Sequence, residues 1–219
     1  MYHEKKQNRT ATIAKLQRVV SNINKDTVLA TELAEYGYDT TTIQQGEALY
    51  NTLIEKYNTN KTESAEETTV YAVFDAALES TLAIYSTDRK KAKIVFKDQP
   101  DVLKNLHVKG IAPVRNAALI DTMRLFYETL NTNTQLLNAL QRLKITADHV
   151  TQQLTNIVNT QNTYATYIQE KGESQQATQD KNKAFDAVTK WVGEFYAVAK
   201  IALDDQPQLL ESVAKLLRS

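Results

Sequence analysis

The chain has no cysteine among its 219 residues, and it has no excess of charge of either sign. Without cysteine, disulfide scaffolds, thiolate zinc sites and thiol nucleophiles are excluded. Lys and Arg together number 26, and Asp and Glu also number 26, so the chain as a whole is not drawn electrostatically to nucleic acid or to an anionic membrane. We therefore predict that nucleic acid is not a partner.

Long hydrophobic runs are also missing. No apolar run is longer than residues 70–74, which end at Asp75, whereas a helix that spans a bilayer needs about 20 apolar residues. The polar N-terminal residues 1–9 lead directly into an amphipathic pattern, without the apolar stretch of a secretory signal. These features predict a cytoplasmic protein with no transmembrane segment.

Glycine and proline are scarce, with 5 and 3 residues respectively. Tight turns and phosphate-binding loops consume these residues, so their scarcity disfavours all-β folds and nucleotide-binding α/β folds. An apolar fraction of 42% is sufficient for a hydrophobic core in a chain of this length. We predict an all-α fold whose helices are joined by few loops.

The sequence contains an internal repeat. Residues 92–103 and 199–210 are identical at seven of twelve positions, at an offset of 107 residues. The same offset aligns apolar positions without a gap back to the N-terminus, for example Leu33 with Leu140. We predict two tandem helical units, 1–112 and 113–219, packed together as one elongated bundle. Two explanations remain open: an ancient duplication whose copies bury each other's apolar faces, or two equivalent binding sites.

Within the first unit, apolar spacing of three and four residues predicts a helix over residues 8–24. Thr27 is expected to be the N-cap of a short second helix, and Gly37 is suited to the left-handed position after its end. Asp39 or Thr40 is then expected to cap a third helix.

The stretch after this cap is either one long helix over residues 41–97 or a helical hairpin that turns within residues 58–69. Side chains seven residues apart keep a common phase through this polar segment, which a turn does not need to preserve. The phase therefore favours a single coiled-coil-like helix of about 85 Å. Its counterpart in the second unit covers residues 146–203, where Gly172 weakens the middle.

The long helices are expected to end at two equivalent junctions, formed by Asp98 with Pro100 and by Asp205 with Pro207. Proline cannot continue a helix but fits the first turn of a new one, and an acidic residue favours the positive end of that helix dipole.

The sequence offers little catalytic chemistry. His3, His107 and His149 are far apart, and none is paired with an acidic residue at the spacing of a helical metal site. Glycine-rich phosphate loops and nucleophile elbows are missing. We therefore predict a chain that is not an enzyme, with no cofactor and no metal.

One basic cluster is a candidate contact for an anion or an acidic partner. Arg89, Lys90, Lys91, Lys93 and Lys97 form the densest basic run, in which Arg89, Lys93 and Lys97 share one helical face. The alternative is an ordinary solvated face, because the second unit lacks an equivalent cluster.

The chain resembles a group of uncharacterised all-helical proteins from the Bacteroidota. The resemblance rests on Tyr36-Gly37-Tyr38, on the long helix with a polar middle, and on the closing Ala-Lys-Ile-x-x-x-Asp-Gln-Pro-x-x-Leu segment. That group has no assigned activity, so the resemblance implies a bacterial all-α protein and carries over no site residue.

These observations favour a non-catalytic interaction or scaffold protein that binds a protein partner or self-associates. Two alternatives remain. One is a membrane-active, toxin-like protein whose amphipathic helices rearrange on lipid. The other is a helical-bundle enzyme or ligand carrier with an internal pocket.

Overall fold

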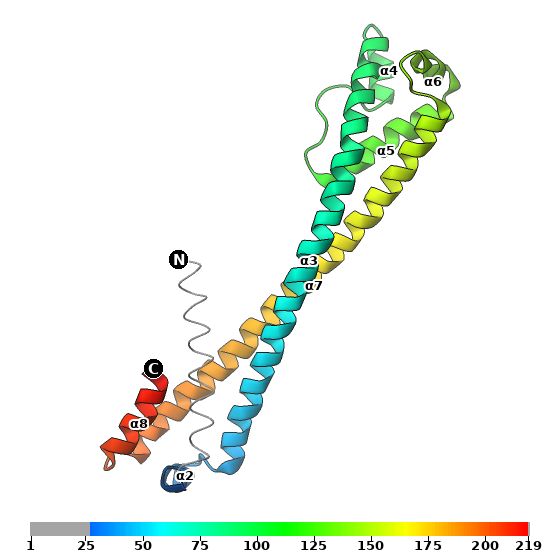
Figure 1. Ribbon diagram of the computed structural model, residues 1–219. Coiled ribbons are helices and arrows are strands. Elements are labelled where there is room, and N and C mark those ends of the chain that lie inside the picture. Colours follow the sequence, from blue (N-terminus) through cyan, green and yellow to red (C-terminus); the bar gives the residue numbers. More distant parts are fainter. Residues whose placement is uncertain (1–26, 219) are drawn as a thin grey trace. The chain divides into compact units, whose positions relative to one another are not determined.

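The computed structural model describes residues 27–218, and every regular element in this part of the chain is a helix. The all-α prediction is therefore confirmed, whereas the helix expected over residues 8–24 lies outside the described residues. In chain order, the helices are α2 (Thr27–Glu35), α3 (Thr40–Val95), α4 (Pro100–Asn105), α5 (Asn116–Thr132), α6 (Thr134–Gln141), α7 (Ala147–Ala202) and α8 (Pro207–Arg218) (Figure 1).

The two long helices, α3 and α7, are each continuous over 56 residues. The single-helix prediction is confirmed, and the alternative of a hairpin within residues 58–69 is wrong. Asp39 caps α3, because its Oδ1 accepts a hydrogen bond from the backbone N–H of Thr42 at 2.9 Å. Hydrogen bonding from Thr42 lowers the pKa of the Asp39 carboxyl. Gly172 is exposed and does not interrupt α7.

Both predicted proline junctions are confirmed. Four residues separate the end of α3 from α4, which begins at Pro100, and four separate the end of α7 from α8, which begins at Pro207. Asp98 and Asp205 lie exposed in these two turns.

Helices α2, α4 and α6 have the same type of C-terminal end. Gly37, His107 and Lys144 have positive φ angles of 86°, 56° and 64°. In each case the next residue donates its backbone N–H to the carbonyl five residues before it, the six-to-one bond of a Schellman motif. Glycine adopts this conformation without strain, whereas His107 and Lys144 adopt it at a cost.

The chain divides into two compact units, each of which contains part of both long helices. Unit 1 consists of Met1–Glu63 with Ser174–Ser219, and unit 2 is Ser64–Glu173. These units divide the chain differently from the two sequence copies, 1–112 and 113–219, because α3 and α7 each contribute residues to both units.

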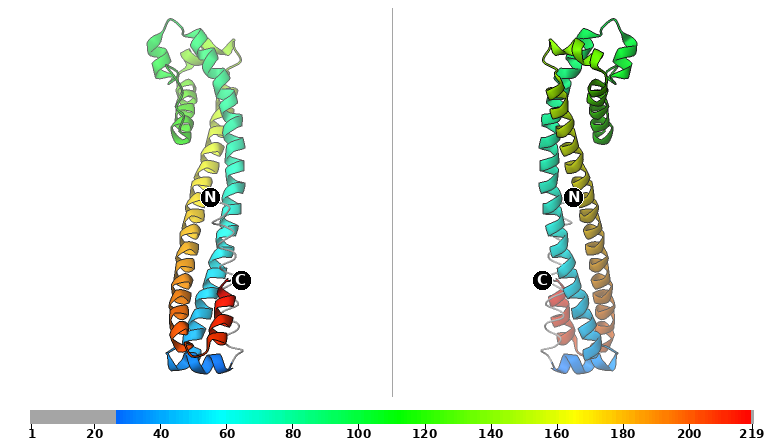
Figure 2. Two further views of the ribbon diagram at one scale, coloured as in Figure 1. Left: turned by 90° about the vertical axis from the view of Figure 1, so that its left-hand side faces the viewer. Right: turned by 90° about the vertical axis from the view of Figure 1, so that its right-hand side faces the viewer.

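Unit 1 has an aromatic core. Trp191 and Phe195 on α7 stack with ring centroids 5.6 Å apart, and Tyr38 meets both rings edge-on. Gly46 on α3 allows the indole of Trp191 to approach closely, because a Cβ at this position would lie 2.5 Å from the ring. In unit 1, α8 turns back along the end of α7 and adds Val213 to the core (Figure 2).

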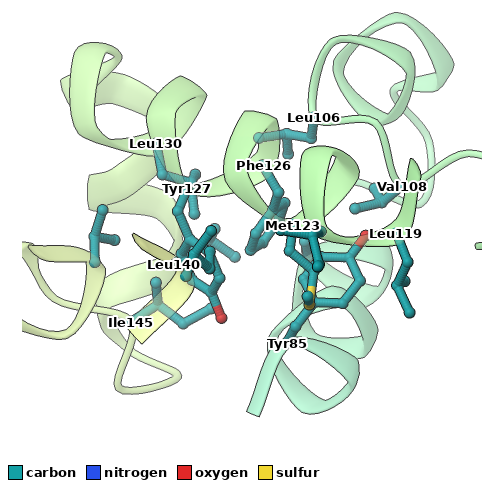
Figure 3. Packing of buried hydrophobic residues seen from close by; sticks show 14 of the residues in the cluster. Tyr85, Leu106, Val108, Leu119, Met123, Phe126, Tyr127, Leu130, Leu140 and Ile145 are labelled. Atoms are coloured by element: carbon teal, nitrogen blue, oxygen red, sulfur yellow. The ribbon is translucent and has the colours of Figure 1, made fainter. Parts of the chain in front are cut away.

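Unit 2 has the larger core, built where α4, α5 and α6 cover the end of α3 and the start of α7. The apolar side of α5 supplies much of it, and Figure 3 shows Met123 and Phe126 near Tyr85, and Tyr127 near Leu140 and Ile145. None of the described helices is long and apolar enough to cross a membrane.

Candidate functional site

The predicted basic cluster lies near the end of α3 in unit 2, and two of its members bind the protein's own backbone. Arg89 Nη2 donates hydrogen bonds to the carbonyl oxygens of Val108 at 3.2 Å and Gly110 at 2.6 Å. Lys93 Nζ donates to the same Gly110 oxygen at 3.1 Å. These bonds fasten the loop between α4 and α5 to the side of α3.

The other three basic side chains of the predicted set differ in exposure, and Lys91 is partly buried because it bonds to Asp88. Lys90 is exposed, and exposed Lys97 lies 3.8 Å from the carboxylate of Asp98. Lys93 is partly covered, and this burial, together with the positive charge of Arg89, lowers its pKa. Arg89 and Lys93 thus hold the loop, Lys91 bonds to Asp88, and Lys90 and Lys97 face solvent. Its role as an anion or partner contact stays a prediction.

Immediately before this cluster lies a buried carboxylate that the sequence pattern did not single out. Asp88 is only 1% exposed. Its Oδ1 accepts a hydrogen bond from Lys91 Nζ at 2.9 Å, and its Oδ2 accepts one from the Tyr127 hydroxyl at 2.9 Å. His149 Nε2 lies 2.5 Å from the same Oδ2. We call Asp88, Lys91, Tyr127 and His149 the Asp88 network.

The Asp88 network joins α3, α5 and α7. Removing a carboxylate from water is costly unless its oxygens gain hydrogen bonds and a countercharge, and here both oxygens have donors. Burial raises the pKa of the Tyr127 phenol, and the charge of Asp88 raises it further. Tyr127 therefore remains a neutral donor at physiological pH.

Each member reaches the network for a local reason. Asp88 lies on the buried face of α3, seven residues after buried Thr81 and four before buried Ala92. His149 is in the first turn of α7. Lys91 lies three residues after Asp88 on α3, so its amine can meet the carboxylate at the edge of the core.

Sequence reasoning missed this network because its members are far apart along the chain. Asp88 and His149 are separated by 61 residues, and no spacing rule links them. One signal was present: Asp88 is a charged residue on a seam that is otherwise apolar or uncharged, which is uncommon unless the charge has partners in the fold.

Chemically, the Asp88 network is suited to holding helices together. Both carboxylate oxygens are occupied by donors from the protein, and the side chain of His149 is only a quarter exposed. His107, by contrast, lies exposed at the turn after α4, away from these hydrogen bonds. His3 lies outside the described residues.

In comparisons with protein-family models, with curated proteins and with solved structures, no match to the chain was found. The resemblance to the Bacteroidota group therefore stays a prediction.

Proposed function

We propose that this chain is a non-catalytic helical interaction or scaffold protein, built from two copies of one helical unit and able to self-associate. The observation that carries the proposal has two parts. Large apolar side chains of α3 and α7 are exposed at the surface. Asp88, the most deeply buried charged side chain of the described residues, forms hydrogen bonds with other side chains of the protein. Both parts of this observation are found in unit 2.

The helix boundaries support the duplication. The starts of α2 and α6, of α3 and α7, and of α4 and α8 are each separated by 107 residues, which is also the offset of the sequence repeat. The ends of the two long helices have the same separation. The positive-φ residues Gly37 and Lys144 are also repeat partners. A shared set of starts, stops and turns is expected of two copies of one unit.

The Asp88 network supports a structural use of the buried charge. A general acid or base has to reach its substrate, whereas Asp88 is enclosed and bonded to Lys91, Tyr127 and His149. A carboxylate that is satisfied in this way fixes the relative positions of α3, α5 and α7 within unit 2.

The apolar surface of unit 2 supports self-association. On α7, Val158 and Ile168 are 53% and 47% exposed, and exposed Ala165 lies between them at a spacing that places all three on one side of the helix. On α3, Tyr71 and Val73 are also exposed. Helical stripes of this kind are the usual seam between paired helices, so a second copy of the chain is a suitable partner.

The proposal is tested by sedimentation velocity with the full chain over a range of concentrations. We expect a reversible monomer–dimer equilibrium in the wild type. The double variant Val158→Asp/Ile168→Asp should remain monomeric because it places charge in the proposed seam. The matched control is Ile201→Asp, which changes an exposed isoleucine of α7 that belongs to unit 1. A monomeric wild type at every concentration, or equal dimerisation of the double variant, would contradict self-association.

A further inference from the structure

The loop between α4 and α5 presents two aliphatic side chains to solvent. Ile111 and Val114 are 95% and 92% exposed. The loop around them is nevertheless attached to the fold: Val108 is buried, Ala112 packs against the core of unit 2, and the Gly110 oxygen accepts hydrogen bonds from α3. Ile111 is therefore held outward between two anchored residues.

The segment that carries this loop is strongly basic, although the whole chain is neutral. Residues 89–115 contain eight Lys or Arg and two Asp, a net charge of +6, so the rest of the chain carries −6. Lys109 and Arg115 flank the two aliphatic residues along the loop. The two acidic residues are Asp98 and Asp101, in and just after the turn that follows α3.

The adjacent face of α3 has the same combination of chemistry. Lys90, Lys93 and Ile94 share one face of α3 by their spacing, Ile94 is 66% exposed, and exposed Lys97 follows in the turn after the helix. Lys93 contacts the loop directly through its bond to Gly110. We call these four residues, together with Lys109, Ile111, Val114 and Arg115, the basic loop surface.

This combination fits the headgroup region of an anionic bilayer. There, aliphatic side chains enter the boundary of the acyl chains while Lys and Arg remain beside lipid phosphates and carboxylates. An acidic polypeptide would satisfy the cations but would leave two projecting aliphatic side chains in water. The exposed side chains of Ile111 and Val114 within a basic segment therefore favour lipid as the partner.

We propose that the basic loop surface binds anionic membranes peripherally, with Ile111 and Val114 inserted at headgroup depth. The attachment uses an anchored loop of unit 2 and needs neither a transmembrane helix nor the rearrangement of amphipathic helices. It goes beyond the proposed scaffold function and does not depend on self-association.

The test is co-sedimentation of the full chain with two kinds of vesicle, one of phosphatidylcholine alone and one of phosphatidylcholine mixed with phosphatidylserine. We expect binding only to the mixed vesicles, and weaker binding as salt is raised. The double variant Ile111→Ser/Val114→Ser should lower the partition coefficient about tenfold, because it removes the inserted apolar groups. Lys90→Gln/Lys109→Gln should also weaken binding, by removing charge.

Two controls make the outcome decisive. Ile201→Ser removes an exposed isoleucine from unit 1 and should bind like the wild type, and circular dichroism melts establish that each variant folds. Soluble polyglutamate serves as the acidic-polypeptide probe. The proposal would be overturned if the wild-type chain did not co-sediment with the mixed vesicles. It would also be overturned if the variant Ile111→Ser/Val114→Ser bound the vesicles as well as the wild type and polyglutamate competed with that binding. This result would indicate a site for an acidic polypeptide. Neither result affects the sedimentation test of self-association.

Discussion

Phe195 in unit 1 and Asp88 in unit 2 lie 107 residues apart, and each is almost completely buried on a long helix. Phe195 is held by the stacked ring of Trp191 and the edge of Tyr38. Asp88 is held by hydrogen bonds from Lys91, Tyr127 and His149. Two positions equivalent in the repeat thus bury a phenyl ring in one unit and a carboxylate in the other.

The difference shows which features each unit depends on. Apolar burial has no preferred direction, so unit 1 requires mainly the correct volume around its rings. A buried carboxylate requires donors at defined distances and angles, so unit 2 also requires α5 and α7 to lie correctly against α3. Unit 1 should therefore be most sensitive to changes of size, and unit 2 to the loss of single polar atoms.

The largest expected effect is in unit 1. Phe195→Ala removes a fully buried ring and leaves a cavity beside Trp191, which should lower the free energy of unfolding by about 4 kcal/mol. Urea denaturation followed by circular dichroism measures this loss. A cost smaller than that of Asp88→Ala would reverse the ranking of the two positions.

Asp88→Ala should follow, with a loss of about 3 kcal/mol, because it leaves the donors of Lys91, Tyr127 and His149 without their acceptor. The matched control is Asp186→Ala on the exposed surface of α7, which should change stability by less than about 0.5 kcal/mol. Equal urea midpoints for the two variants would show that the buried carboxylate does not hold unit 2 together.

Size sensitivity in unit 1 is tested most directly at Gly46. An added Cβ would lie 2.5 to 2.8 Å from three atoms of the Trp191 indole, so Gly46→Ala should cost about 2 kcal/mol through overpacking. Gly193→Ala on α7 is the control, because a Cβ there meets nothing within 4 Å. That variant should gain up to about 1 kcal/mol from better helix propensity. If Gly46→Ala and Gly193→Ala shifted the melting temperature in the same direction, the close contact between Gly46 and Trp191 would be contradicted.

Polar sensitivity in unit 2 is tested by Tyr127→Phe, which should cost about 1.5 kcal/mol at neutral pH by removing a hydrogen bond to a charged group. Burial and Asp88 raise the pKa of Tyr127 above the ordinary 10.0 of tyrosine. Its contribution to stability is therefore complete below a pH of about 10 and is lost as the pH rises further, since only the unfolded chain then ionises readily. Urea titrations at several alkaline pH values should show the wild-type advantage shrinking above that point. A constant difference would contradict the burial of the phenol.

The smallest expected effect compares the two equivalent turns. Lys144→Gly should stabilise the chain by about 1 kcal/mol, because glycine accepts the positive φ of 64° without strain. Gly37→Ala should destabilise it by a similar amount, since φ is 86° there. Differential scanning calorimetry distinguishes the two signs, and a destabilising Lys144→Gly would show that the lysine side chain makes contacts that outweigh the backbone strain.

Much of the helical layout was predictable because its causes are local. Pro100 and Pro207 start helices since proline suits a first turn, Asp39 caps α3 through a bond to Thr42, and Gly37 closes α2 in a left-handed conformation. The continuity of α3 followed from an apolar phase that no proline interrupts. Each of these inferences uses residues within a few positions of one another.

The candidate sites were less predictable because their partners are distant in sequence. The basic cluster was recognisable in the sequence as a run of charge, but the different contacts of its members were not. Arg89 and Lys93 bond to a loop about 20 residues away, whereas Lys90 faces solvent. No rule of residue spacing predicts the Asp88 network, because its members come from distant parts of the sequence. Only the packing of α5 and α7 against α3 brings Tyr127 and His149 to Asp88.

The all-helical class, the long helices and the positions of their ends follow from local sequence, because backbone sterics, capping and apolar periodicity act over short distances. Which charges bond within the fold and which side chains stay exposed depends instead on how distant segments pack against one another. Burial and hydrogen bonding depend on residues that approach in space. For this reason Asp88 is enclosed by three donors, while Ile111 and Val114, on a loop anchored by two cations, are held in solvent.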